Sequence, residues 1–181
     1  MERALATAQA LFHAQGYDAL GVAAITEALG INPPSFYAAF GSKAGLFERI
    51  VERYSCSALP MDALLSPGRA PAEALTALLE TAARIYTADP DARGCLVLEA
   101  ARSDGEAMPR SAALRAKHAS WQRIRDFVAQ TDPGAADAAA DYAMTAMSGL
   151  SASAREGWDG ERVARVARAA SAGFAALLGA A

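Results

Sequence analysis

Apolar side chains recur at intervals of three and four residues along most of this chain, and this spacing limits the fold more than any other feature. It is the spacing of one buried face of an α-helix, whereas no segment alternates apolar and polar residues as a half-buried strand would. The expected helices, about nine, cover approximately residues 1–16, 22–29, 33–40, 43–54, 75–86, 93–102, 109–128, 135–156 and 161–178. We therefore expect an all-α protein.

The composition is that of a globular protein. Of the 181 residues, 53% are apolar and 20% are charged, and the net charge is −3. Cys56 and Cys95 are the only cysteines, and two thiols so far apart in sequence indicate neither a disulfide framework nor a zinc site. No segment has the pattern of a signal peptide or the roughly 18 apolar residues of a membrane span. We expect a cytoplasmic protein with no membrane partner, no metal and no cofactor.

Two adjacent prolines, Pro33 and Pro34, lie between segments that are otherwise helical in pattern. A proline in a helix interior costs about 3 kcal/mol because it removes a hydrogen bond, but the first turn has no such bond to lose. With Asn32 as N-cap, the prolines therefore begin a helix. The Asn32 side chain is then expected to accept a hydrogen bond from the N–H of Ser35, since Pro34 has none to donate.

This helix is expected to end at Gly41 after about two turns, with Phe36 and Phe40 on its buried face. Ser42 is the expected N-cap of the next helix, and Lys43 lies in the first turn of that helix. A cation in this position opposes the helix dipole, so an anion bound at the same place would explain it.

Two short helices joined by a tight turn predict a helix-turn-helix at residues 21–40. The stretch ALATAQALFHAQGYDALGVAAITEALGINPPSFYAAFGSKAGLFERIVERY resembles the N-terminal DNA-binding domain of the TetR family of transcriptional regulators. The residues in the family's places are Leu11, Phe12, Gly16, Tyr17, Ile25, Gly30, Tyr37, Phe40, Ser42, Lys43, Leu46 and Phe47. The resemblance predicts a DNA-binding domain at residues 1–54 and a helical ligand-binding and dimerisation domain at residues 55–181.

The resemblance implies that residues 33–40 form a recognition helix in the major groove of operator DNA. The candidate base-reading residues, which lie off the Phe36/Phe40 face, are Asn32, Pro34, Ser35 and Ala38. Tyr37 and Lys43 resemble a family tyrosine and lysine that contact phosphates. Because the base-reading side chains are short, readout is expected to use thymine methyl groups and DNA shape. The alternatives are that Tyr37 packs at the domain rim, that Lys43 is solvated, and that Ser35 and Ala38 are exposed without touching bases.

Two features depart from the family pattern. Leu20 and Gly21 stand where the family usually has a Thr or Ser pair that caps the second helix. Residues 1–50 carry three basic and four acidic side chains, a net charge of −1, which predicts weak non-specific binding to DNA. A basic segment before Met1, as in other family members, would be expected to raise the affinity.

The two C-terminal helices are rich in Ala, Ser and Gly. Small residues allow close helix packing, which suits the four-helix dimer interface that the resemblance implies; a tightly packed core within one chain is the alternative. For a small-molecule effector, apolar or amphipathic, the expected pocket residues are Tyr86, Cys95, Leu98, Met108, His118, Trp121 and Met147. Each of these side chains is also typical of an ordinary core.

These features predict a ligand-responsive repressor that binds a palindromic operator as a homodimer. An enzyme is not expected, because only His13 and His118 could act as imidazole bases and no catalytic motif is present. The low basic charge leaves a third hypothesis, a TetR-like ligand-sequestering or protein-interaction module that does not bind DNA. Salt dependence separates these hypotheses, because affinity for DNA falls steeply as salt rises.

Overall fold

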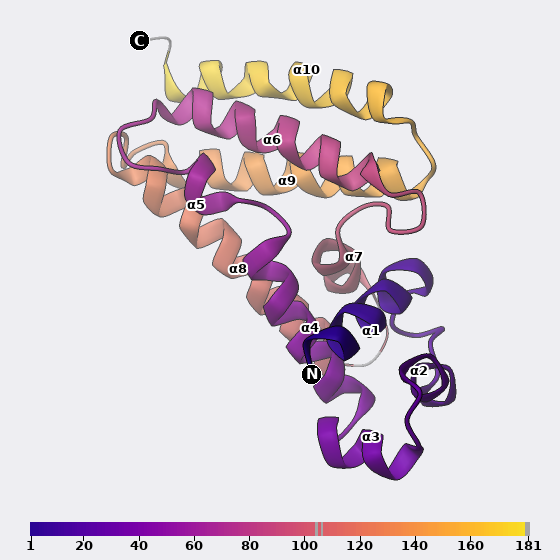
Figure 1. The fold of residues 1–181 in the computed structure, drawn as a ribbon. Coiled ribbons are helices and arrows are strands. Elements are labelled where there is room, and N and C mark those ends of the chain that lie inside the picture. Colours follow the sequence, from indigo (N-terminus) through magenta and orange to yellow (C-terminus); the bar gives the residue numbers. More distant parts are fainter. Residues whose placement is uncertain (104, 106, 180–181) are drawn as a thin grey trace. The chain divides into compact units, whose positions relative to one another are not determined.

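The computed structural model describes residues 1–103, 105 and 107–179. Every regular element in this part of the chain is an α-helix, as predicted (Figure 1). The helices are α1 (Glu2–Gln15), α2 (Val22–Leu29), α3 (Pro33–Phe40), α4 (Lys43–Ser57), α5 (Met61–Leu64), α6 (Pro71–Ala88), α7 (Leu96–Arg102), α8 (Ala107–Ala129), α9 (Ala136–Arg155) and α10 (Gly160–Leu178). The helix that the sequence did not predict is α5, a single turn in a proline-containing segment.

The helices form two compact units. The first unit comprises Met1–Ser57 and Cys95–Lys117, so it contains α1 to α4, α7 and the beginning of α8. The second unit comprises Ala58–Gly94 and the chain from His118 onward. The first stretch of the first unit ends close to the predicted domain boundary at residue 54. The inclusion of Cys95–Lys117 was not predicted, because helical spacing does not show which distant helix a segment packs against.

Aromatic rings form the centre of the first unit. The ring of Phe12 on α1 lies 5.7 Å from that of Tyr17 and 5.0 Å from that of Phe47 on α4, between centroids. The side chains of Leu46 and Ile50, on the same helix as Phe47, are completely buried. Burying such side chains contributes about 1.5–3 kcal/mol each. The packing of α1 against α4 therefore stabilises the unit that carries the shorter helices α2 and α3.

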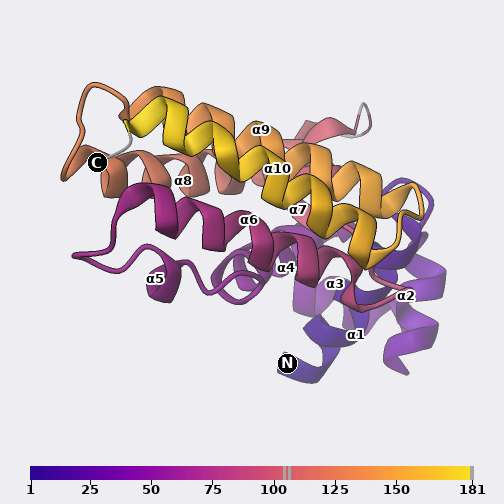
Figure 2. The ribbon, with the colours of Figure 1, turned by 90° about the horizontal axis from the view of Figure 1, so that it is seen from above.

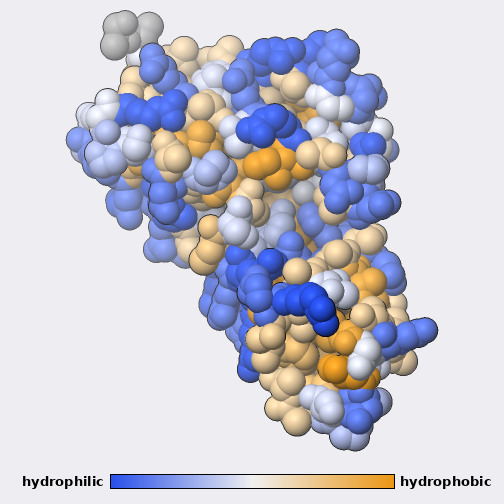
Figure 3. Space-filling model, viewed as in Figure 1, coloured by the Kyte–Doolittle hydropathy of each residue, from blue (hydrophilic) through white to orange (hydrophobic). Residues whose placement is uncertain are grey.

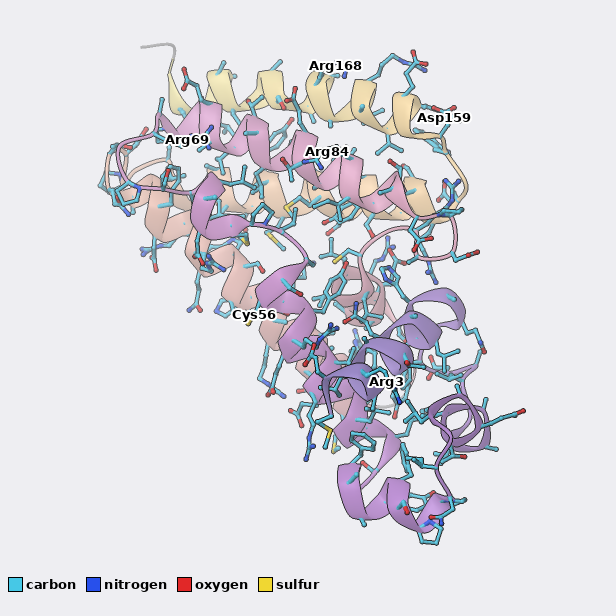
Figure 4. The ribbon with its side chains drawn as sticks, viewed as in Figure 1. Arg3, Cys56, Arg69, Arg84, Asp159 and Arg168 are labelled. Carbon is cyan, nitrogen blue, oxygen red and sulfur yellow. The ribbon has the colours of Figure 1, made fainter. Side chains whose placement is uncertain are left out.

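In the second unit, α10 packs alongside α6 and α9, and both views show this arrangement (Figures 1 and 2). Tyr142 on α9 packs edge-on against the fully buried ring of Phe174 on α10, with centroids 5.1 Å apart. The Tyr142 hydroxyl donates a hydrogen bond of 2.6 Å to the carbonyl oxygen of Ala170. Asp159, labelled in Figure 4, caps α10 by accepting a 2.7 Å hydrogen bond from the N–H of Arg162.

The apolar side chains of α8 are not all buried. Ile124 and Val128 are fully buried, whereas Leu114 on the same helix is 45% exposed. Among the described residues, no helix is long and apolar enough to span a membrane.

Candidate nucleic-acid interface

The beginning of α3 has the geometry predicted from its prolines. Asn32 is the N-cap, and its side-chain oxygen accepts a hydrogen bond of 2.9 Å from the N–H of Ser35. Pro33 and Pro34 occupy the first turn, where no intrahelical bond is lost. The double proline is therefore a helix start, as predicted.

The turn before α3 is fixed by Gly30. This residue ends α2 in the left-handed conformation, with φ 65° and ψ 33°, which glycine adopts without steric cost. The N–H of the following residue, Ile31, donates a hydrogen bond of 3.0 Å to the carbonyl oxygen of Thr26. This pattern closes α2 tightly and holds α3 in the second position of a helix-turn-helix.

One face of α3 is buried and the opposite face is exposed. Phe36 is completely buried and Phe40 is 6% exposed, which anchors α3 to the first unit. Six residues before Phe36 or between Phe36 and Phe40 are exposed: Asn32, Pro33, Pro34, Ser35, Tyr37 and Ala38. The Tyr37 side chain is 51% exposed, and its ring packs edge-on against Phe36 with centroids 5.3 Å apart. Tyr37 is thus about half exposed, with its ring packed against Phe36.

The surface over α3 carries little charge. In the space-filling view, the surface where α3 lies in Figure 1 has a mixed hydropathy, with orange and tan areas beside white and blue ones (Figure 3). The helix contains Pro, Ser, Phe, Tyr and Ala alone, so long polar side chains do not contribute to the exposed face. The predicted base-reading residues Asn32, Pro34, Ser35 and Ala38 therefore lie together on one short, nearly neutral surface.

The Lys43 side chain is directed into the first unit. Its Nζ donates hydrogen bonds of 3.0 Å and 3.1 Å to the carbonyl oxygens of Tyr17 and Leu20, and lies 4.0 Å from the centroid of the Tyr17 ring. The ammonium group thus ties the start of α4 to the turn between α1 and α2. The sequence predicted a phosphate contact and not this role, because its partners lie 23 and 26 residues away. An ammonium group has three donors, so one N–H is left for a phosphate.

The arginines of the first unit differ in whether an acidic side chain already neutralises them. Among the arginines of residues 1–57, Arg53 pairs with Glu2, whereas Arg3 and Arg49 form no ion pair with any described residue. Arg3 lies on α1 (Figure 4). The guanidinium carbon of Arg49 lies 5.8 Å from the centroid of the Phe40 ring, which brings this cation close to α3. Arg49 was not predicted as a contact residue, since its neighbour Phe40 lies on a different helix.

A buried polar contact joins α7 to α4. Burial and the neighbouring Cys95 thiol raise the pKa of the Tyr54 phenol well above its ordinary value. The ring of His13 on α1 packs edge-on against that of Tyr54, at 5.8 Å between centroids. Cys95, predicted as a ligand-binding residue, thus lies in the core of the first unit against Tyr54.

The seven predicted ligand-binding residues are distributed over both units. Cys95, Leu98 and Met108 belong to the first unit, and the others to the second. Four of the seven are buried: Tyr86, Cys95, Leu98 and Met147. Met108 is 61% exposed and His118 is also exposed. Within the second unit, His118 stacks on Trp121 at 5.6 Å between centroids, and Trp121 Nε1 donates a 2.8 Å hydrogen bond to Asp141.

Two surface cavities are lined by other residues. A cavity of about 330 Å³ lies between α1 and α2, and one of about 370 Å³ lies between α6 and α10. None of the seven predicted residues lines either of them. No group of three potential metal ligands occurs in the described part of the chain.

Residues 4–50 match the family model of bacterial regulatory proteins, tetR family. The HTH-type transcriptional repressor BdcR of Escherichia coli (strain K12) is 42% identical over 149 residues, which are 82% of this chain and 75% of BdcR. The chain belongs to the TetR family. The predicted resemblance is thus confirmed, and with it the assignment as a DNA-binding transcriptional regulator and not an enzyme.

Solved structures of TetR-family proteins share the fold. A cysteine mutant of the TetR family transcriptional regulator CifR, complexed with 26-bp double-strand operator DNA, is 31% identical with a TM-score of 0.83. The match covers 94% of this chain and 95% of CifR. A TetR-family regulator from Agrobacterium tumefaciens, 20% identical, has a TM-score of 0.78 over 94% of this chain and 95% of its own, and shows the fold alone.

Proposed function

We propose that this TetR-family regulator is a repressor that binds a palindromic operator as a homodimer and releases it when a small molecule binds. The observation that supports this most directly is α3, a capped two-turn helix with an exposed face of short side chains, placed second in a helix-turn-helix. The relative BdcR is a repressor, and CifR was solved with operator DNA. A protein acting on DNA in this way works in the cytoplasm, as expected from the sequence.

In this proposal α3 enters the major groove, and its exposed residues divide into two groups. Asn32, Pro34, Ser35 and Ala38 face the base edges, while the Tyr37 hydroxyl and the remaining Lys43 N–H reach phosphates. Arg49, which lies near α3, is a further candidate for a phosphate contact.

The experiment that tests DNA binding is selection of bound duplexes from random DNA, followed by titration of the selected operator at several salt concentrations. A DNA-binding regulator loses affinity steeply as salt rises. Tyr37→Phe should weaken binding to all duplexes alike, whereas Ser35→Ala should change the preference among operators. If no sequence is enriched and no binding depends on salt, the chain is instead a ligand-sequestering or protein-interaction module.

The proposed dimer forms through α9 and α10. Their exposed surfaces include Val166 and Leu177, which are 44% and 37% exposed, beside many Ala residues. The glycine at position 173 on α10 is required by packing within one chain, since a Cβ there would lie 2.5 Å from the Tyr142 hydroxyl. Gly149 on α9 is exposed, and a Cβ there would meet nothing within 4 Å. Glycine weakens a helix interior by about 0.5–1 kcal/mol relative to alanine. Close approach of a second copy of the chain would explain why a glycine occupies position 149.

Gly149→Leu tests this surface. Gly149 is exposed and a Cβ there meets nothing within 4 Å, so the monomer fold is expected to persist while the dimer dissociates. Sedimentation velocity gives the oligomeric state, and circular dichroism gives the fold. Gly134→Leu is the matched control, because this glycine precedes α9 and a Cβ there meets only Asp132, at an ordinary 3.6 Å. A Gly149→Leu protein that remains dimeric places the interface elsewhere.

The effector is proposed to be apolar or amphipathic and to bind at predicted residues of the second unit, Tyr86, His118, Trp121 and Met147. A ligand releases DNA only by binding one conformer more tightly than the other, and the coupling cannot exceed that difference. Titration of the operator complex with a panel of small molecules measures this coupling. Two recognition helices of a dimer must reach half-sites about 34 Å apart, so a change in their spacing is sufficient for release.

A further inference from the structure

The exposed face of α3 has very little capacity for hydrogen bonds to bases. Ser35 contributes one hydroxyl group, while Pro34 and Ala38 contribute only apolar atoms. All three side chains are exposed, so none of them is needed to hold α3 in the first unit. The face is built to touch apolar groups rather than to exchange hydrogen bonds.

Asn32 is the one residue here with an amide, and this amide already has a structural task. Its oxygen is held at 2.9 Å on the N–H of Ser35, where it caps the helix. Bidentate recognition of adenine would use this same oxygen together with the amide nitrogen. The cap therefore commits the amide oxygen to α3, so the N–H₂ donors are the part of this amide that is left for a base.

Among the base edges in the major groove, the C5-methyl group of thymine is the apolar feature that side chains such as alanine contact. Pro34 and Ala38 are four residues apart, so they lie on one face and are separated by about 6 Å along the helix. Stacked base pairs follow one another at about 3.4 Å. Two such contacts along the groove would thus fall roughly two base steps apart.

We propose that Pro34 and Ala38 recognise the C5-methyl groups of two thymines in each operator half-site, an inference that rests on the proposed function. Short side chains suit this role, because they allow the helix backbone to approach the groove floor closely. The specificity of the regulator then depends on shape and apolar contact, with Ser35 contributing the one side-chain hydroxyl among the three.

The test replaces each thymine of the selected operator, one at a time, by deoxyuridine. Deoxyuridine lacks only the methyl group, so base pairing and the other groups in the groove are unchanged. At two thymines per half-site, roughly two base steps apart, the affinity is expected to fall about fourfold, the factor for one buried methyl-sized group. Substitution at the other thymines should leave the affinity unchanged.

Protein variants assign the two thymines. Ala38→Gly should remove the effect of deoxyuridine at one of them, and Pro34→Ala should reduce it at the other. Ala39→Gly is the control for Ala38→Gly, because it makes the same change on the same helix at a half-buried position. It should weaken binding, if at all, without altering the response to deoxyuridine. If Ala38→Gly unfolds the helix, Pro34→Ala and the wild-type deoxyuridine scan still decide the question.

The two possible failures are distinguishable. An operator that binds tightly and with salt dependence, but whose affinity is the same with deoxyuridine at every position, overturns the methyl recognition and leaves the repressor proposal standing. Failure to enrich any operator overturns the repressor proposal itself.

Discussion

Replacing Lys43 by methionine removes the ammonium group while keeping an unbranched apolar side chain of similar length. Two hydrogen bonds are lost, those from Nζ to the carbonyl oxygens of Tyr17 and Leu20, together with the cation–π contact to the Tyr17 ring. A hydrogen bond to a charged group contributes about 1.5–3 kcal/mol when buried, and a partly exposed cation–π contact about 0.5–1 kcal/mol. Since the Lys43 side chain is half-buried, we take the lower value for each contact and expect the free energy of unfolding to fall by about 3.5 kcal/mol.

Urea unfolding of the protein without DNA measures this loss directly. Lys117→Met is the matched control, because Lys117 is the other lysine of the chain, is also half-buried, and forms no hydrogen bond, ion pair or cation–π contact with any described residue. Its unfolding free energy should change by less than about 0.5 kcal/mol.

Operator titration separates the structural role of Lys43 from a phosphate contact. If its third N–H also binds a phosphate, Lys43→Met reduces the slope of log affinity against log salt by about one. A variant that is as stable as wild type, whatever its DNA affinity, would show that the contacts to Tyr17 and Leu20 do not hold the turn, and the reasoning would fail.

Three further changes have defined outcomes. Asn32→Ala removes the cap of α3 and should lower the free energy of unfolding by about 1 kcal/mol, whereas Asn32→Gly should lower it by only a few tenths of a kcal/mol. Urea unfolding measures both values, and equal effects would contradict the capping role of Asn32. Gly173→Ala should destabilise the protein by about 1–2 kcal/mol in the same assay, because the added Cβ displaces Tyr142 and breaks its hydrogen bond to Ala170. An unchanged urea midpoint would show that the Tyr142 ring can move without cost. Burial raises the pKa of the Tyr54 phenol, so the contribution of the neutral phenol to stability is present below about pH 10 and is lost as the pH rises further. The Tyr54→Phe variant should therefore lose less stability than wild type between pH 8 and pH 11. Equal losses in the two proteins would contradict this role of Tyr54.

Local features of the fold were predictable because their causes lie within a few residues. The Asn32 cap, the place of Pro33 in the first turn and the left-handed Gly30 each depend on contacts no more than five residues away. The buried and exposed faces of α3 follow from the spacing of Phe36 and Phe40 in the same way.

Features that depend on distant partners were not predictable from one sequence. Periodicity shows that a helix has a buried face but not what covers it, so the packing of Cys95–Lys117 with the N-terminal helices could not be inferred. The same limit applies to the Lys43 contacts and to the exposure of Leu114. The candidate base-reading residues lie together on α3 because they share one short helix, whereas Lys43 is directed toward Tyr17 and Leu20. The ligand-binding residues were chosen by side-chain type, which says nothing about which of them are in contact.

The two prolines of α3 also affect how fast and how readily the protein can engage DNA. An isolated helix of eight residues would be largely unfolded in water, since its nucleation is unfavourable. Pro33 and Pro34 limit the backbone conformations open to the unfolded segment, and Phe36 and Phe40 fasten the folded one to its unit. The proposed DNA-reading surface is thus ordered before an encounter, so association requires no coil-to-helix step and loses little conformational entropy. A rigid helix can then discriminate between sequences through contacts as weak as single methyl groups.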